Sequence, residues 1–285
     1  MTDSSHSSRA GFVERDGARL HYVLSGRVHA PAVLLLHALG ADHHMWDGQL
    51  AALERSFGVL RLDTRGHGKS TYVDGANGVD AARDRSVADY GADAIAVLDA
   101  LHIERAHWVG LSMGGMVAMW VASQVPASPG ASSLSQRVGR VVLANTSAHM
   151  GPRESWDMRI ETLRRDGLGG LAAGLGERWY GAEFRKRSPD VIESTAATLR
   201  ATSARGYAEA CTAIRDMDQR EGIAAIASPT LVIAGAQDVA TPLEHAEGLT
   251  ARIAGSDLIV LDAGHMSARE QAEDFTDALM DFLQD

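Results

Sequence analysis

Residues 106–116 read AHWVGLSMGGM, an apolar run that leads into Ser112 and a helix-forming run that follows it. Gly110 and Gly114 flank the serine two positions away on either side, which gives the pattern GxSxG. Between a strand and a helix, this pattern is typical of a nucleophilic serine held at a sharp turn, where small neighbours let the backbone approach without clash. We therefore predict that Ser112 is a nucleophile.

Short β-rich runs alternate with helical patterns around this turn, which favours a mostly parallel central sheet flanked by helices. Residues 89–101 are expected to form a helix, because Ile95, Leu98 and Leu101 share one face. Antiparallel pairing is an option for the first strands. The expected strands of the first half are residues 20–24, 33–36, 59–62, 107–111 and 138–144.

The strand pattern stops near Ser147 and resumes after Glu221. Between these points amphipathic helical segments dominate, among them residues 154–165 and 206–218. Beyond them we expect strands at 230–234 and 258–261 and a final helix at 270–283.

We therefore predict one α/β core, residues 1–146 and 222–285, interrupted by a helical cap at residues 147–221. A stretch rich in Pro, Ser and Gly lies between Gln124 and Gln136 and is expected to be a surface excursion.

A serine hydroxyl needs a base within hydrogen-bond reach and an acid that orients the base. On this kind of sheet the acid and then the base follow the serine along the chain. Asp238 comes after the expected strand 230–234, and His265 comes after the strand 258–261. Taken singly, Ser112 is equally plausible as a strand end, Asp238 as a helix cap and His265 as a surface loop histidine. Their order and their places after strands predict a triad of Ser112, His265 and Asp238.

Acyl transfer also needs backbone N–H groups aimed at the oxyanion that forms on the carbonyl oxygen. Met113 supplies one such amide because it follows the nucleophile. The second is expected from the loop 37–40 (HALG), with Leu39 as the donor. We expect His37 to brace this loop rather than to act as a base.

The bulk composition limits the partners of the chain. Its formal net charge of −10 disfavours nucleic acid and anionic membranes, and no local basic patch stands out in the sequence. The opening residues lack the apolar stretch of a secretory signal, so a cytoplasmic protein is expected.

Metal binding is not expected either. The lone Cys211 is interpreted as a buried structural thiol. No metal site is predicted at His43 and His44, because neighbouring residues of a helix point apart.

Three motifs resemble the α/β-hydrolase superfamily: residues 63–70 (DTRGHGKS), 110–116 (GLSMGGM) and 263–266 (AGHM). The cap motifs make the chain most similar to the 3-oxoadipate enol-lactonases of bacterial aromatic catabolism. These motifs are residues 144–147 (ANTS), 154–156 (ESW), 159–162 (RIET), 177–180 (ERWY) and 213–216 (AIRD). One departure is His37-Ala38, where the superfamily usually has His-Gly.

The resemblance implies hydrolysis of 3-oxoadipate enol-lactone to 3-oxoadipate, a step of the β-ketoadipate pathway, through an acyl-enzyme on Ser112 and without a cofactor. Trp156 and Arg159 share one face of a cap helix and are predicted to bind the small ester or lactone through its carboxylate. A solvated arginine beside a packed tryptophan is the alternative.

Two other functions use the same motifs. One is a broader carboxylesterase or a carbon–carbon bond hydrolase of ring-cleavage products, which relies on the same triad. The other is a non-catalytic ligand-binding protein on the same fold. The sequence leaves homo-oligomerisation and cap mobility open.

Overall fold

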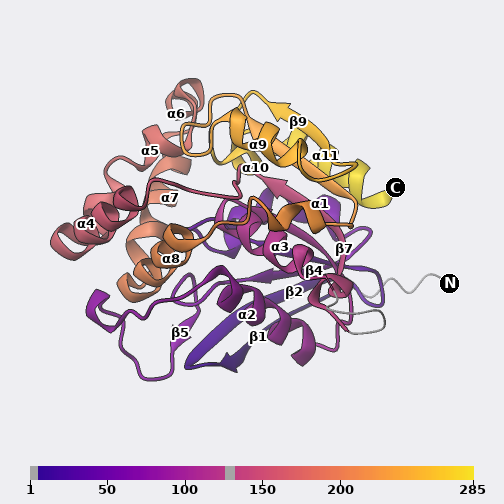
Figure 1. Ribbon diagram of the computed structural model, residues 1–285, viewed down its shortest axis with the longest axis horizontal. Coiled ribbons are helices and arrows are strands. Elements are labelled where there is room, and N and C mark those ends of the chain that lie inside the picture. The colour runs from indigo at the N-terminus through magenta and orange to yellow at the C-terminus, as the bar shows by residue number, and fades with distance from the viewer. Residues whose placement is uncertain (1–5, 126–131) are drawn as a thin grey trace.

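The computed structural model describes residues 6–125 and 132–285 (Figure 1). Within them the strands form one sheet in the order β1-β2-β4-β3-β6-β7-β8-β9, and β5 pairs with β2. Neighbours from β4 to β9 are parallel, whereas β1 with β2 and β2 with β4 are antiparallel, so the predicted mostly parallel sheet is confirmed. The strands are β1 His6–Arg15, β2 Ala18–Arg27, β3 Ala32–Leu36, β4 Gly58–Leu62, β5 Thr71–Tyr72, β6 Ala106–Leu111, β7 Val138–Ala144, β8 Thr230–Gly235 and β9 Asp257–Leu261.

The helices follow the strands in alternation and then cluster between β7 and β8. In the first half they are η1 His43–Trp46, α1 Asp47–Leu53, η2 Val79–Ala81, α2 Val87–Ala100, α3 Met113–Ser123 and η3 Leu134–Arg137. Between β7 and β8 they are α4 Arg153–Ala172, α5 Leu175–Trp179, α6 Ala182–Arg187, α7 Pro189–Ala201, α8 Ala204–Asp216 and η4 Gly222–Ala225. The last three are α9 Leu243–Thr250, α10 Ser267–Glu270 and α11 Ala272–Gln284.

The central strands are buried on both faces. Every residue of β4 and β8 is buried, although successive side chains point to opposite sides of the sheet. Helix α3 packs on β6 and β7, α2 packs against α3, and α1 packs against α11. This burial explains why these strands read as continuous apolar runs rather than as alternating ones.

Strand β1 is not among the sequence predictions. The opening residues are polar, and this strand lies at the edge of the sheet, where exposed polar side chains such as Arg9 and Glu14 leave no continuous apolar run. Its pairing with β2 over ten residues defines it instead. Residues 126–131 of the predicted surface excursion lie outside the described residues, and its last residues belong to η3.

Helices α4–α8 stand together at one side of the molecule, coloured pink to orange in Figure 1. Helix α8 contacts the core through two glycines, since a Cβ on Gly206 would lie 2.6 Å from Cα of Gly66. The amide of Ser203 donates to the carbonyl of Gly66 at 2.8 Å. These helices lie inside the predicted cap, whose limits as a separate domain remain a prediction.

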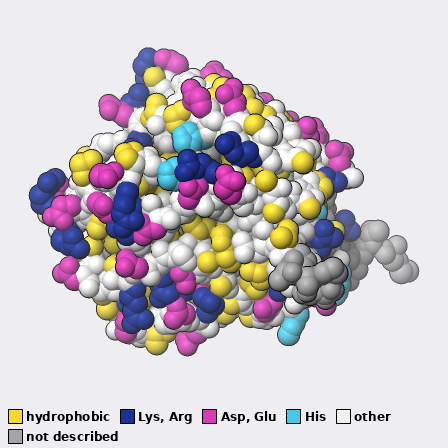
Figure 2. Space-filling model, in the orientation of Figure 1, with side chains coloured by type: hydrophobic (Ala, Val, Ile, Leu, Met, Phe, Trp, Pro, Cys, Tyr) yellow, Lys and Arg dark blue, Asp and Glu magenta, His cyan; other side chains and the backbone are white. Residues whose placement is uncertain are grey.

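Charged side chains of both signs are interspersed over the face shown in Figure 2. The search for membrane-spanning helices covered the described residues and found none that is long and apolar enough.

Candidate active site

Ser112 lies in the turn between β6 and α3 with φ 56° and ψ −117°, a backbone conformation that side chains other than glycine rarely adopt. Such a residue stores about 1–3 kcal/mol of strain. The turn is held by hydrogen bonds from the Ser112 amide to the Ala144 carbonyl (2.9 Å) and from the Thr146 hydroxyl to the Ser112 carbonyl (2.7 Å). The sequence pattern thus forms the strand–turn–helix unit expected from it.

The two glycines of the motif are required by close backbone contacts. A Cβ on Gly110 would lie 2.2 Å from the Gly114 backbone, and a Cβ on Gly114 would lie 2.1 Å from the carbonyl oxygen of Leu36. Helix α3 can therefore approach β3 and β6 closely enough to present Ser112 above the carboxyl ends of the strands.

Asp238 and His265 meet in the way the sequence order predicts. Nδ1 of His265 donates to Oδ2 of Asp238 at 2.8 Å, and both side chains are buried. The Thr241 hydroxyl also donates to Oδ2 at 2.7 Å, while the amides of Ala240 and Thr241 donate to Oδ1 at 2.8 and 2.9 Å. Burial alone would raise the pKa of Asp238, but the adjacent His265 and the Thr241 hydrogen bonds outweigh it and hold the pKa well below its usual range.

Ser112 and His265 line one pocket, together with Leu39. Its other walls include Met116, Met150 and Ile214. The structure has no hydrogen bond between Ser112 and His265, and contacts of this kind often tighten only in the complex with substrate. The three predicted residues are therefore brought together at the carboxyl ends of β6, β8 and β9.

The predicted oxyanion donors lie next to this pocket. Met113 is the first residue of α3, so its amide has no partner within the helix. Among the described residues the Leu39 amide has no acceptor either, and Leu39 lines the pocket. The adjacent Gly40 turns the loop with φ 76°. Both amides are thus available to a developing negative charge on a bound carbonyl oxygen.

His37 braces the predicted oxyanion loop, residues 37–40, through hydrogen bonds of both ring nitrogens. Its Nε2 accepts a hydrogen bond from the Thr64 amide at 3.0 Å, so the proton is on Nδ1, which donates to the Ala38 carbonyl at 2.8 Å. Burial lowers the pKa of His37, which keeps the ring neutral. With both nitrogens occupied, His37 has no free site for base catalysis.

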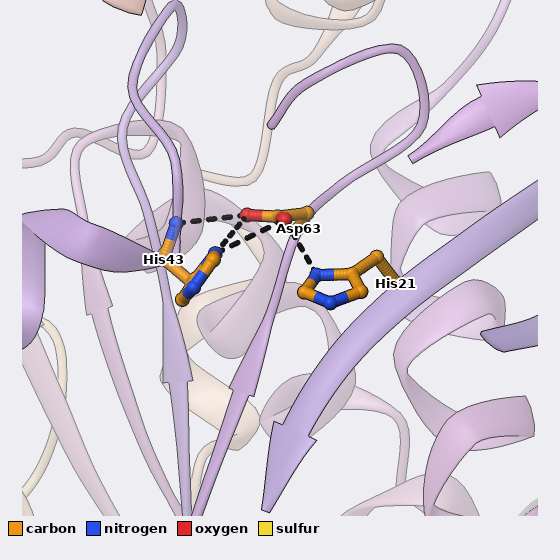
Figure 3. A group of neighbouring side chains, drawn as sticks. All are labelled: His21, His43 and Asp63. Atoms are coloured by element: carbon orange, nitrogen blue, oxygen red, sulfur yellow. Dashed lines mark hydrogen bonds and ion pairs between the residues drawn. The ribbon is translucent and has the colours of Figure 1, made fainter. Parts of the chain in front are cut away.

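A second brace was missed by sequence reasoning. Figure 3 shows His21 and His43 on either side of the Asp63 carboxylate. His21 Nδ1 donates to Oδ2 at 2.8 Å, and His43 donates to Oδ1 from its amide at 2.8 Å and from Nδ1 at 3.0 Å. Burial would raise the pKa of Asp63, but the two histidines hold it far below its usual range. The strand β4 is thereby tied to the far end of the loop that carries Leu39.

His21, His43 and Asp63 are also the residue types that bind metal ions, and their ligand atoms lie within 4.8 Å of one another. Each Nδ1 already bonds directly to the carboxylate, so an ion would have to replace every one of these hydrogen bonds. We therefore assign the cluster to bracing.

The expectation that His43 and His44 point apart is wrong for their rings. The ring centroids are 4.0 Å apart, because the two residues open the tight helix η1. The Nδ1 atoms nevertheless face different acids, Asp63 for His43 and Asp47 for His44.

Both predicted substrate-binding residues of the cap reach the pocket. Trp156 is buried and donates to the Met150 carbonyl, and Nε of Arg159 donates to the Tyr207 hydroxyl at 2.7 Å.

Cys211 is buried on α8, where burial raises the pKa of its thiol to about 12. The thiol is therefore inert, as the sequence predicts for a structural cysteine.

Arg178 is a pocket residue that sequence reasoning did not single out as functional. It lies on α5 and lines the pocket with Arg159 and Ser112. No carboxylate within the described part of the chain forms an ion pair with it. Partial burial and the positive charge of Arg159 lower its pKa. The only sequence signal was its place in the ERWY motif, which carries no information about where the side chain points.

Comparison with known protein families agrees with this geometry. Residues 31–270 match the model of the alpha/beta hydrolase fold family. The chain is 34% identical to 3-oxoadipate enol-lactonase 1 of Acinetobacter baylyi, over 95% of both chains.

Two solved structures are also similar. An enol-lactonase from Burkholderia xenovorans is 35% identical with a TM-score of 0.87, covering 96% of this chain and 100% of that one. A hydrolase from Pseudomonas aeruginosa is 40% identical with a TM-score of 0.86, covering 96% and 98%.

Proposed function

The chain belongs to the alpha/beta hydrolase fold family, and from that premise we propose that it hydrolyses a small carboxylic ester or lactone through an acyl-enzyme on Ser112. The substrate best supported is 3-oxoadipate enol-lactone, with 3-oxoadipate as the product. This substrate would place the protein in the β-ketoadipate pathway of aromatic catabolism. We also propose a cytoplasmic location.

One observation carries the proposal: a single pocket contains a serine on a strained turn, an acid-oriented histidine and two arginines. The first two groups fit nucleophilic catalysis. The arginines fit a substrate that bears a carboxylate away from its reacting carbonyl. The two relatives named as enol-lactonases, at 34% and 35% identity, support the same substrate class.

The first half-reaction uses the geometry of the turn. Nε2 of His265 accepts the proton of the Ser112 hydroxyl as Oγ attacks the lactone carbonyl. The amides of Leu39 and Met113 stabilise the oxyanion. The carbon–oxygen bond of the ring then breaks, and His265 returns the proton to the enol oxygen that leaves. Asp238 stabilises the imidazolium that exists between these two proton transfers.

The second half-reaction repeats these steps with water. His265 takes a proton from water, the hydroxide oxygen attacks the acyl carbon, and the proton passes to Ser112 Oγ as the ester bond breaks. The released enol relaxes to the ketone, which makes the whole hydrolysis strongly favourable. Apart from substrate and water, each step uses only side chains and amides of this chain, and no cofactor is invoked.

Arg178 is the best-placed group to bind the substrate carboxylate. Arg159 already donates to Tyr207, and its guanidinium lies 6.0 Å from the Trp156 ring and 5.6 Å from the Tyr207 ring. Its position is therefore fixed. Arg178 has no such partner among the described residues, so a ligand carboxylate would supply a counter-charge and relieve the repulsion between the two arginines.

A substrate panel tests the proposal. The wild-type protein and Ser112→Ala are assayed with enol-lactone, neutral aryl esters and a ring-fission product of the type cleaved by carbon–carbon bond hydrolases. We expect turnover of the enol-lactone to exceed that of the others and to disappear in the variant. Rapid turnover of aryl esters with none of the enol-lactone would replace the lactonase assignment with a broader carboxylesterase. No turnover of any compound would favour a ligand-binding protein.

A further inference from the structure

Asn145 follows β7 and contacts two parts of the candidate triad at once. Its Nδ2 donates to Oδ2 of Asp238 at 3.0 Å and to the carbonyl of Gly264, the residue before His265, at 3.2 Å. Its Oδ1 accepts from the Ser267 hydroxyl, two residues after His265. The side chain therefore links the acid to both flanks of the base.

The orientation of this amide is fixed by its partners. A carboxylate oxygen and a carbonyl oxygen only accept hydrogen bonds, so both must face the NH₂ group, and the Ser267 hydroxyl donates to the oxygen. Asn145 is 2% exposed, and Ser267 is fully buried. All three polar contacts are thus made away from water, where an unmade hydrogen bond is most costly.

The backbone of Asn145 supports the same interpretation. Its φ of 43° places it in the left-handed region, which asparagine tolerates better than most residues. The backbone N–H of Asn145 continues the sheet pairing by donating to the Ile233 carbonyl at 2.8 Å. The turned backbone aims the side chain across the carboxyl end of β8 towards Asp238.

We infer that Asn145 is a positioning residue for the triad: it orients the Asp238 carboxylate and fixes the loop that presents His265. The inference rests on the serine mechanism proposed above, but not on the identity of the substrate. Asn145 acts through Asp238 and His265 and does not touch the reacting atoms.

Other charged groups surround the same imidazole. Asp238 bonds to its Nδ1, and Glu270 accepts from the Gly264 amide at 2.9 Å. Arg178 lines the same pocket. The Thr241 hydroxyl and the amides of Ala240 and Thr241 also donate to Asp238, but among the described residues none of them bonds to Gly264 or Ser267 as Asn145 does.

Asn145→Asp tests the inference because it keeps the shape of the side chain and tolerates the same backbone. The new carboxyl group can donate to Asp238 only while it is protonated. Two carboxyl groups about 3 Å apart share one proton and titrate as a coupled pair. We therefore expect a new ionisation in the pH profile of kcat/KM for a neutral aryl ester, with activity lost as the shared proton leaves.

The same profile is measured for the rate at which a fluorophosphonate labels Ser112, which requires an activated serine but no particular substrate. The matched control is Asn77→Asp, the same change at the other asparagine of the chain, which is exposed. This variant should keep the wild-type profile. Asn145→Ala should lower both rates about 10- to 100-fold, the effect of one lost hydrogen bond to a charged group.

Thermal unfolding of each variant shows whether it is folded. If Asn145→Asp does not fold, Ser267→Ala serves instead, since it removes the hydroxyl that orients the Asn145 amide. A reduced kcat with unchanged KM in Ser267→Ala supports the inference, and a wild-type kcat contradicts it. Folded Asn145→Asp with a wild-type pH profile overturns the inference alone. A wild-type protein that is not labelled at Ser112 overturns the serine mechanism and this inference with it.

Discussion

The carboxylate of Asp238 accepts a hydrogen bond from Nδ1 of His265 at 2.8 Å, in a site where both side chains are buried. This contact joins the loop after β8 to the loop after β9, and it fixes which nitrogen of His265 faces the pocket. In the proposed mechanism this contact lets Asp238 orient His265 and stabilise its charged form.

Replacing Asp238 by Asn keeps the size of the side chain but removes its charge. We expect kcat for ester hydrolysis to fall about 10⁴-fold, the magnitude known for the equivalent change in a serine protease triad, because His265 loses its orienting acceptor. Steady-state kinetics at pH 7 with an aryl ester measure the change. A loss below tenfold would show that the acid of the site is another residue.

The same carboxylate should make folding stability depend on pH. Its pKa is lower in the folded chain than the usual value of 3.8. The ionised form therefore stabilises the fold above that value, and the contribution is lost as the pH falls through the depressed folded pKa. Urea unfolding between pH 2.5 and 7 should show a steeper acidic loss for the wild type than for Asp238→Asn. Parallel curves would contradict the assigned pKa direction.

Arg178→Gln should discriminate between charged and neutral substrates. Losing a charge-assisted hydrogen bond to a carboxylate costs about 1.5–3 kcal/mol, or roughly 10- to 100-fold in kcat/KM for the enol-lactone. A neutral aryl ester should be hydrolysed as by the wild type. Lys186→Gln, a change of an exposed cation on α6, is the matched control. Equal losses for both substrates would mean that Arg178 only shapes the pocket.

The two histidines of η1 should differ sharply in their contribution. His43 donates to the buried Asp63, so His43→Ala should destabilise the fold by about 1–3 kcal/mol and lower kcat by loosening the oxyanion loop. His44 pairs with Asp47 at the surface, so His44→Ala should change stability by less than about 0.5 kcal/mol. Urea unfolding and aryl ester kinetics compare the two variants. Similar effects of His43→Ala and His44→Ala would contradict the bracing role assigned to Asp63.

Two glycine-to-alanine changes should have opposite signs. Gly114→Ala would drive a Cβ into the Leu36 carbonyl, so we expect a protein that is poorly folded or inactive. Gly169 lies in α4 two residues after the non-helical Gly167, with open space around its Cβ position, so Gly169→Ala should stabilise by about 0.4–1 kcal/mol through a less flexible unfolded chain. Thermal melts measure both effects, and a tolerated Gly114→Ala would contradict the close packing of α3 on β3.

The sheet and the triad candidates were predictable because their signals are local. Ser112, Asp238 and His265 each follow a continuous apolar run, and the carboxyl ends of parallel strands meet at one edge. Strand β1 gave no such signal, since its evidence is its pairing with β2.

The supporting residues were not predictable for a related reason. Asn145, Asp63 and Arg178 draw their interest from partners that are distant in the sequence. Asn145 meets Asp238 across 93 positions, and Asp63 meets His21 across 42. No periodicity or short motif records which side chains become neighbours once the sheet has formed.

The most direct test of the central claim is peptide mapping by mass spectrometry after reaction with a fluorophosphonate. We expect one adduct, on the peptide that contains Ser112, formed rapidly in the wild type and at least a hundredfold more slowly in His265→Gln. An adduct on another residue, or equal rates in the two proteins, would contradict a serine nucleophile activated by His265.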